Sequence, residues 1–325
     1  LHGRIRPAAA KNSVLPLLAA TLLCRTPSRL RAVPPLADVA TSLALLQSVG
    51  AKAERQGSDL FVAPGQDLQG EIPDYLAGAM RSSVFYLAPL LCRVGEVRLP
   101  LPGGCKLGPR PVDIHLAGLA AMGAQVELEG IAVTLRRRGP LHGVDFALRL
   151  PSVGATMTLM MAATQAGGTT ILRGAACEPE ICDLANFLRA CGAHITGAGT
   201  PVVVIQGGKP LQGTAWTPLP DRIAAATYAA ALACAGGEVT VTHCAPAYYA
   251  ASRLFAGGGR GCCPPGYHRH AGPKPRPAFA RRTNALRQRL ARLCHRYRAP
   301  GCRRTADRRR PQRDLRPPVC PPLCL

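Results

Sequence analysis

Apolar residues along the chain follow two spacings, which alternate and define two kinds of segment. The first kind has apolar positions typical of a helix, then a break with glycine, then a strand-like run, and it covers residues 81–99, 153–172 and 222–241, with a weaker copy at 12–29. The second kind starts at aspartate, carries leucine at helical spacing, stops near Gly-Ala and ends in two strand-like runs, at residues 38–63, 113–135 and 183–205. Glycine commonly ends a helix, and runs of Val, Ile and Thr favour strands.

The two kinds of segment together form an internal repeat. Copies of the first kind begin near residues 12, 81, 153 and 222, so the repeat unit is about 70 residues long. We expect it to be a β-α-β-α-β-β unit in some circular order, which predicts an α/β protein. After Val241 the repeat stops, and from Gly257 onward the chain has no Ile, no Glu, one Val and eleven Pro. Residues 256–325 are therefore predicted to form an irregular tail.

The positive charge of the chain is concentrated in this tail. Residues 1–250 hold 21 basic and 16 acidic side chains, whereas residues 251–325 hold 19 basic and 2 acidic ones, out of a net charge of +22. No run in the body reaches the roughly 18 apolar residues of a membrane span, and no signal peptide pattern begins the chain. Together with cysteines that form no C-x-x-C pair, this favours a cytoplasmic protein without a membrane partner.

Three interpretations of the tail remain open. It could be an arginine-rich arm for nucleic acid, with its densest charge at 303–310. It could hold a metal ion with Cys262, Cys263, His268 and His270, although adjacent cysteines do not match the usual zinc-ligand spacing. It could also be the product of a frameshift in a GC-rich gene, since Arg, Pro, Gly, Ala and Cys all have GC-rich codons. We favour the frameshift, and expect neither a metal site nor nucleic acid as a partner.

Cys105 differs from the other cysteines of the body because it lies in a loop, Pro-Gly-Gly-Cys-Lys, rather than in an apolar run. Gly103 and Gly104 let the backbone turn sharply, and the cations Lys106 and Arg110 would lower the thiol pKa. Such a thiol can act as a nucleophile or as a proton donor. The alternative is an unreactive loop cysteine, and composition alone leaves both open.

Several predicted helix starts carry groups suited to an anion. Lys11 and Asn12 immediately precede a helix pattern, and Arg81 and residues 152–154 begin two others. The backbone N–H groups and the dipole at a helix start favour negative charge. The alternative for Lys11 and Asn12 is a solvated lysine beside an asparagine cap. Taken together, the three helix starts and the Cys105 loop predict a phosphate-bearing substrate between the repeats.

The motifs that contain these residues resemble a known family, the UDP-N-acetylglucosamine enolpyruvyl transferases. The resemblance covers residues 1 to about 255 and rests on Lys11-Asn12, MRSS at 80–83, and the blocks LPGGCKLGPRPVDIHLAGLAAMGA (101–124), PSVGATMTLMMAAT (151–164), EPEICDLANFLRACGA (178–193) and LPDRIAAATY (219–228). It implies the enolpyruvyl-transferase fold, with two domains of three β-α-β-α-β-β units each. Here the first domain would be 11–217, and an incomplete second domain would comprise 1–10 plus 218–255.

The resemblance also implies a reaction, with phosphoenolpyruvate and UDP-N-acetylglucosamine as partners and no cofactor. The enolpyruvyl group would pass to the 3′-hydroxyl of the sugar with release of phosphate, the first committed step of peptidoglycan synthesis. Cys105 matches the proton donor, which fosfomycin alkylates in this family. Lys11, Asn12 and Arg110 match the residues that bind phosphoenolpyruvate. The UDP-sugar contacts would be Arg81, Arg110, Pro111, Val112, Asp113, Ile114, Leu150, Pro151, Ser152 and Val153.

The sequence departs from the family in two places. The chain begins at Leu1 without methionine, so we expect about one strand to be missing at the front. The aspartate that acts as general base, in a Pro-Thr-Asp-like loop, has no counterpart, and Asp307 and Asp314 lie among arginines without that context. We therefore expect a fragment without turnover. The alternatives are a shikimate-pathway enolpyruvyl transferase, against which the Pro-Gly-Gly-Cys loop argues, and a non-catalytic protein that binds nucleic acid through its tail.

Overall fold

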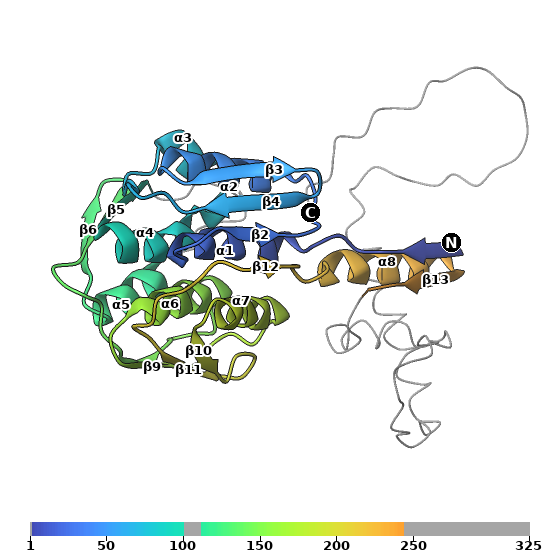
Figure 1. The fold of residues 1–325 in the computed structure, drawn as a ribbon. Helices are drawn as coiled ribbons and strands as arrows, with labels where there is room; N and C mark the ends of the chain where they lie inside the picture. The colour runs from blue at the N-terminus through green and yellow to red at the C-terminus, as the bar shows by residue number, and fades with distance from the viewer. Residues whose placement is uncertain (1, 101–111, 244–325) are drawn as a thin grey trace, which may run out of the picture. The chain divides into compact units, whose positions relative to one another are not determined.

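The computed structural model describes residues 2–100 and 112–243 (Figure 1). Segments of the first kind form helices followed by strands, as the apolar spacing predicts. The helices are α1 (Lys11–Ala20), α4 (Leu87–Val94), α6 (Val153–Gln165) and α8 (Arg222–Ala235), and the strands are β2 (Ser28–Leu30), β5 (Glu96–Pro100), β9 (Thr169–Arg173) and β13 (Glu238–Val241). Two shorter helices lie within these segments, η1 (Thr21–Leu23) and η2 (Arg81–Tyr86), and a third, α3 (Asp74–Ala79), precedes η2. Arg81 thus starts a 3₁₀ turn that leads into α4.

Segments of the second kind each form a helix and a β-hairpin. The helices are α2 (Ala37–Ser48), α5 (Asp113–Ala121) and α7 (Pro179–Ala190), and the hairpins are β3–β4 (Lys52–Gln56, Asp59–Ala63), β6–β7 (Gln125–Glu129, Ala132–Arg136) and β10–β11 (His194–Thr196, Val202–Gln206). One predicted boundary is wrong, because α7 begins at Pro179 rather than at Asp183. Proline suits the first turn of a helix, and Glu178 is its N-cap residue. Asp183 therefore lies within the helix, at a buried position.

The strands form three sheets that repeat one plan, together with a separate pair. Their orders are β12-β2-β4-β3, β5-β7-β6, β10-β11-β9-β8 and β1-β13. In two sheets a strand that precedes a first-kind helix pairs in parallel: β8 (Asp145–Ala147) with β9, and β12 (Ala215–Trp216) with β2. A parallel bridge between Glu71 and Arg98 occupies the same place beside β5. These additions complete the β-α-β-α-β-β unit, and the α/β fold class is confirmed.

Helices α1 and α6 lie in the core. Every residue of α1 from Ser13 to Ala20 is buried, as is every residue of α6 from Ala155 to Thr164. A helix that is apolar on all sides packs against neighbours all around. Helix α5 can approach α6 closely because Gly118 faces Leu159, whose side chain would lie 2.4 Å from a Cβ at this position.

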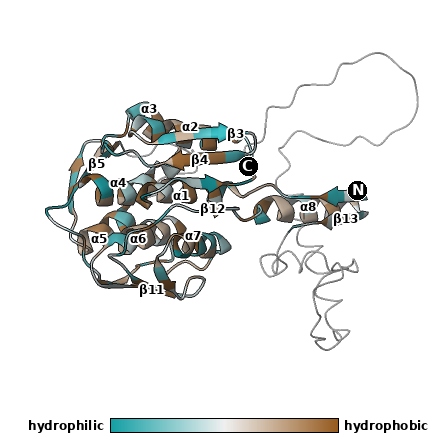
Figure 2. Ribbon diagram, viewed as in Figure 1, coloured by the Kyte–Doolittle hydropathy of each residue, from teal (hydrophilic) through white to brown (hydrophobic). Residues whose placement is uncertain are grey.

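The hydropathy of a strand follows its place in a sheet (Figure 2). Strand β3, at the edge of its sheet, has the polar sequence KAERQ, whereas its neighbour β4 has the more apolar sequence DLFVA. Polar side chains on an edge strand oppose pairing with a second chain. The hairpin therefore combines a half-buried, apolar strand with a polar edge strand.

The segments that we assign to a second domain meet in one sheet. Strand β1 (His2–Ile5) pairs in parallel with β13, with His2 opposite Glu238 and Ile5 opposite Val241. The domain boundaries themselves, 11–217, 1–10 plus 218–255 and 256–325, stay predictions. The candidate metal ligands Cys262 to His270 and the arginines at 303–310 lie outside the described residues.

The described residues contain neither a membrane-spanning helix nor a cluster of metal-ligating side chains. Within 2–100 and 112–243, no helix has the length and apolar character to cross a membrane. Over the same residues, no group of three His, Cys, Asp or Glu side chains is placed to hold a metal ion.

Candidate functional site

The starts of three helices border one cavity with a volume of about 740 Å³. Lys11 and Asn12 come from α1, Arg81 and Ser82 from η2, and residues 152–154 from α6. These segments are about 70 residues apart in sequence, and the repeat brings equivalent helix ends together. A cavity bordered by helix N-termini is a favourable place for an anionic group.

Two of these helices begin with different capping patterns. At α6, the Ser152 hydroxyl accepts a hydrogen bond from Ala155 N at 3.3 Å, which caps the helix. At α1 the N-cap is Ala10, whose carbonyl accepts from Ser13 N and Val14 N, and no side chain caps the helix. Asn12 lies inside the first turn, so the alternative of an asparagine cap is wrong. The first turn of α1 also contains no acidic residue to offset its dipole.

Two cations of the cavity are paired with carboxylates from other elements. Lys11 Nζ lies 2.8 Å from Asp38 Oδ2, and the two side chains are 50% and 33% exposed. Arg222 Nε lies 3.0 Å from Glu180 Oε1, and the Glu180 side chain is only 5% exposed. The Lys11 pair is open to solvent and therefore weak, so an incoming phosphate can compete for this cation.

His115 of α5 lies buried at the back of the cavity beside the start of α6. Its Nδ1 is 3.0 Å from the Thr158 hydroxyl, and its ring lies close to Gly154, where a Cβ would be 3.0 Å from Cε1. Burial, with a further contribution from the charge of Arg81, lowers the pKa of His115 to about 4. The imidazole is therefore neutral at pH 7, and Arg81 and Lys11 supply positive charge instead.

The cavity contains part of the site predicted from sequence. Five of the predicted residues line it: Lys11, Asn12, Arg81, Ser152 and Val153. Five others do not line it, namely Val112, Asp113, Ile114, Leu150 and Pro151. Among these, Asp113 forms an ion pair with Arg149, and Ile114 is buried. The remaining three, Cys105, Arg110 and Pro111, lie outside the described residues.

The sequence reasoning missed five titratable residues of the cavity lining. These are Asp38, His115, Glu178, Glu180 and Arg222. A signal was available for four of them, because they lie in blocks on which the family resemblance rests, at 101–124, 178–193 and 219–228. Asp38 begins a second-kind segment, and an aspartate at a helix start has a common structural explanation, so the sequence pattern gives no sign that it lies opposite Lys11.

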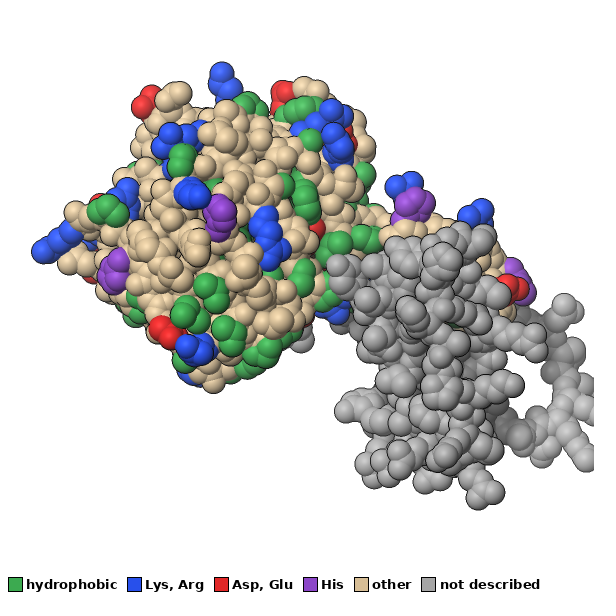
Figure 3. All heavy atoms as spheres, turned by 60° about the horizontal axis from the view of Figure 1, so that its bottom comes forward, with side chains coloured by type: hydrophobic (Ala, Val, Ile, Leu, Met, Phe, Trp, Pro, Cys, Tyr) green, Lys and Arg blue, Asp and Glu red, His purple; other side chains and the backbone are tan. Residues whose placement is uncertain are grey.

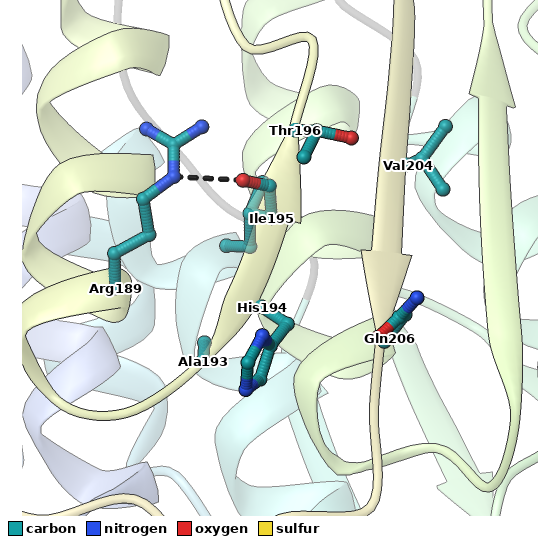
Figure 4. Close-up of a pocket in the computed structure, with 7 residues that line it drawn as sticks. All are labelled: Arg189, Ala193, His194, Ile195, Thr196, Val204 and Gln206. Carbon is teal, nitrogen blue, oxygen red and sulfur yellow. Dashed lines mark hydrogen bonds between the residues drawn. The ribbon is translucent and has the colours of Figure 1, made fainter.

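A second hollow lies beside strands β10 and β11 and contains none of the predicted site residues. Its lining includes Arg189, His194 and Gln206, and Figure 4 shows Arg189 turned toward the backbone of Ile195, with Nε donating to the carbonyl at 2.8 Å. His194 Nε2 also lies 3.0 Å from Lys209 Nζ. Arg189 and His194 therefore have partners within the fold, and we assign no ligand to this hollow. On the face drawn in Figure 3, the described Lys and Arg side chains lie scattered among other side chains.

Comparison with known proteins agrees with the repeated fold. The family model described as EPSP synthase (3-phosphoshikimate 1-carboxyvinyltransferase) matches residues 1–256. In solved structures, the enolpyruvyl transferase NikO from Streptomyces tendae superposes with a TM-score of 0.65 at 24% identity, over 74% of this chain and 57% of that one. At this identity the superposition establishes the fold alone.

Curated relatives are more similar in sequence. The UDP-N-acetylglucosamine 1-carboxyvinyltransferase of Cellvibrio japonicus is 45% identical over 244 residues, which are 75% of this chain and 58% of the relative. The enzyme with the same name from Nitratidesulfovibrio vulgaris is 47% identical, again over 75% of this chain and 58% of the relative. The chain therefore spans little more than half the length of these relatives. On the match over residues 1–256, the chain belongs to the EPSP synthase family, which includes the carboxyvinyltransferases.

Proposed function

We propose that this chain carries the substrate-binding part of a UDP-N-acetylglucosamine 1-carboxyvinyltransferase. The whole reaction would transfer the enolpyruvyl group of phosphoenolpyruvate to the 3′-hydroxyl of UDP-N-acetylglucosamine and release phosphate, for peptidoglycan synthesis in the cytoplasm. The observation that carries the proposal is the meeting of three helix starts with Lys11 and Arg81 at one cavity.

The chemistry of both substrates suits this cavity. Each carries phosphate, and a phosphate is stabilised by backbone N–H groups at helix starts and by nearby cations. The Lys11–Asp38 pair is half exposed, so exchanging the carboxylate for a phosphate costs little. Because His115 is neutral at pH 7, it can donate or accept a hydrogen bond without adding charge.

The similarity in sequence favours a UDP-sugar over a shikimate acceptor. Curated relatives named for the UDP-sugar are 43–47% identical to this chain, whereas a structure titled EPSP synthase from Acinetobacter baumannii is 19% identical with a TM-score of 0.60. We assign Cys105 as proton donor, Lys11, Asn12 and Arg110 to phosphoenolpyruvate, and the predicted residues at 81, 110–114 and 150–153 to the UDP-sugar.

Isothermal titration of the full chain with UDP-N-acetylglucosamine tests the proposal. The wild-type protein should bind, and Arg81→Met should weaken binding about tenfold or more, the effect of removing one charged hydrogen-bond donor. The matched control is Arg136→Met on β7, which removes a cation paired with Glu96 and Glu127 and absent from the cavity lining. Loss of affinity in the control, or no binding by the wild type, would contradict the proposal. Binding of shikimate 3-phosphate instead would favour the alternative acceptor.

A further inference from the structure

Asp183 lies on the buried side of α7, where three segments of the chain converge. It is 3% exposed. The Ser13 hydroxyl and the Leu219 backbone N–H donate to its Oδ2, the latter at 3.1 Å, and the Trp216 indole N–H donates to its Oδ1 at 3.0 Å. All three donors are neutral, and they come from α1, from β12 and from the segment that follows β12.

Such a carboxylate is held by hydrogen bonds rather than by an opposite charge in contact with it. Burial raises the pKa of Asp183 and nearby Glu180 raises it further, while the three hydrogen bonds lower it. The other titratable or charged groups on α7, on α1 and on the segment from Trp216 to Arg222 are Cys182, Arg189, Lys11, Asp221 and Arg222, and Arg222 is paired with Glu180. A buried carboxylate with three donors is costly to disturb, because loss of the acceptor leaves the donors unpaired.

The donors belong to two segments that both reach the cavity. Ser13 follows Lys11 and Asn12 in the first turn of α1. Trp216 and Leu219 lie on the segment that leads to Arg222 at the start of α8. Backbone hydrogen bonds run between the same segments, from Ala10 N to Leu219 O at 2.7 Å and from Asp221 N to Ala8 O at 2.8 Å.

We propose that Asp183 is a positioning residue that couples the Lys11 end of α1 to the segment from Trp216 to Arg222. Through this contact, an anion held at Lys11 and the chain that follows β12 adjust together. The inference deepens the proposed function and rests on it, since it assigns to the cavity a connection with the segment that continues into the predicted second domain. Asp183 itself does not line the cavity, so it acts through Ser13 and Leu219.

Trp216 gives a direct readout because it is the single tryptophan of the chain. Tryptophan emission of the wild-type protein should change with pH at a midpoint above the usual aspartate range, as the acceptor of the indole hydrogen bond becomes protonated. Asp183→Asn should abolish this transition. Asp145→Asn, which removes an exposed carboxylate paired with Arg173, should leave it unchanged. A transition that persists in Asp183→Asn would overturn the assignment.

Coupling to the cavity is tested by titration with UDP-N-acetylglucosamine, followed by tryptophan emission and by calorimetry. We expect the ligand to change the emission of the wild type. Asp183→Asn and Ser13→Ala should each suppress this change and weaken binding about fivefold, the worth of one ordinary hydrogen bond. The double variant should bind no more weakly than either single one, since both substitutions break the same contact.

The outcomes separate the two proposals. Binding with an unchanged emission response in both variants would overturn the coupling and leave the proposed function intact. No binding by the wild type would overturn both, while the pH transition would still decide whether Asp183 holds Trp216. If Asp183→Asn does not fold, Ser13→Ala still tests the coupling by emission and calorimetry, because it removes one donor and keeps the carboxylate with its other two.

Discussion

The neutral His115 predicts a specific loss of stability in acid. Its pKa is lowered from 6.5 to about 4 in the folded protein, because burial and the charge of Arg81 disfavour the imidazolium ion. Below pH 6.5 the unfolded chain therefore binds a proton that the folded chain does not bind. The sign follows: the contribution of His115 to stability is complete above pH 6.5 and is lost as the pH falls toward 4. Between pH 7 and pH 5 the loss amounts to about 2 kcal/mol.

Urea unfolding followed by circular dichroism at pH 7 and at pH 5 measures this loss. Wild-type protein contains other titrating groups, including Asp183, whose raised pKa acts in the opposite direction. The comparison is therefore with His115→Asn, which can keep a hydrogen bond to the Thr158 hydroxyl but cannot take up a proton. The wild type should lose about 2 kcal/mol more than the variant over this interval. Equal losses in the two proteins would refute the assignment of a buried neutral histidine.

Two further predictions concern packing. Gly207→Ala should lower the free energy of unfolding by about 2 kcal/mol or more, because its Cβ would lie 2.1 Å from Ala163 O and 2.2 Å from Ala166 O. The control Gly139→Ala, with open space around it, should leave the thermal unfolding midpoint unchanged, and similar midpoints for the two variants would contradict the close approach. Phe187→Ala should lower the free energy of unfolding, measured with a chemical denaturant, by about 3 to 5 kcal/mol, because the ring is fully buried and packs edge-on against Trp216 with 6.2 Å between centroids. Tyr75→Ala, at an exposed position, is the control, and a loss below 1 kcal/mol for Phe187→Ala would show that the contact is not maintained.

Much of the fold followed from local pattern. Helices and hairpins formed at the predicted segments because their signals are short-range: apolar residues at helical spacing, a glycine stop, and Val- or Ile-rich runs. Glycines at 50, 123 and 192 indeed have positive φ, which favours glycine at the end of a helix. The predicted start of α7 is four residues too late because the pattern takes the aspartate as the beginning of each second-kind segment, although Pro179 already fits the first turn.

Strands β8 and β12 were not individually expected. They have only three and two residues, and DFA and AW carry no alternation that a sequence pattern can detect. Their strand character depends on the partners β9 and β2, which they meet in parallel after long stretches of chain. Pairing of this kind is a tertiary effect, since a short strand gains its hydrogen bonds only when the neighbouring edge is already in place.

The sequence by itself determined the repeat, the types of its helices and strands, and the cationic helix starts at Lys11 and Arg81, since these depend on neighbours within a few residues. Only the tertiary structure decided that these starts meet at one cavity, that Lys11 faces Asp38, and that Asp183 joins Ser13 to Leu219. The reason is distance along the chain. Ser13 and Asp183 are 170 residues apart, and no local pattern encodes a contact that exists only when the repeated units pack around a common core.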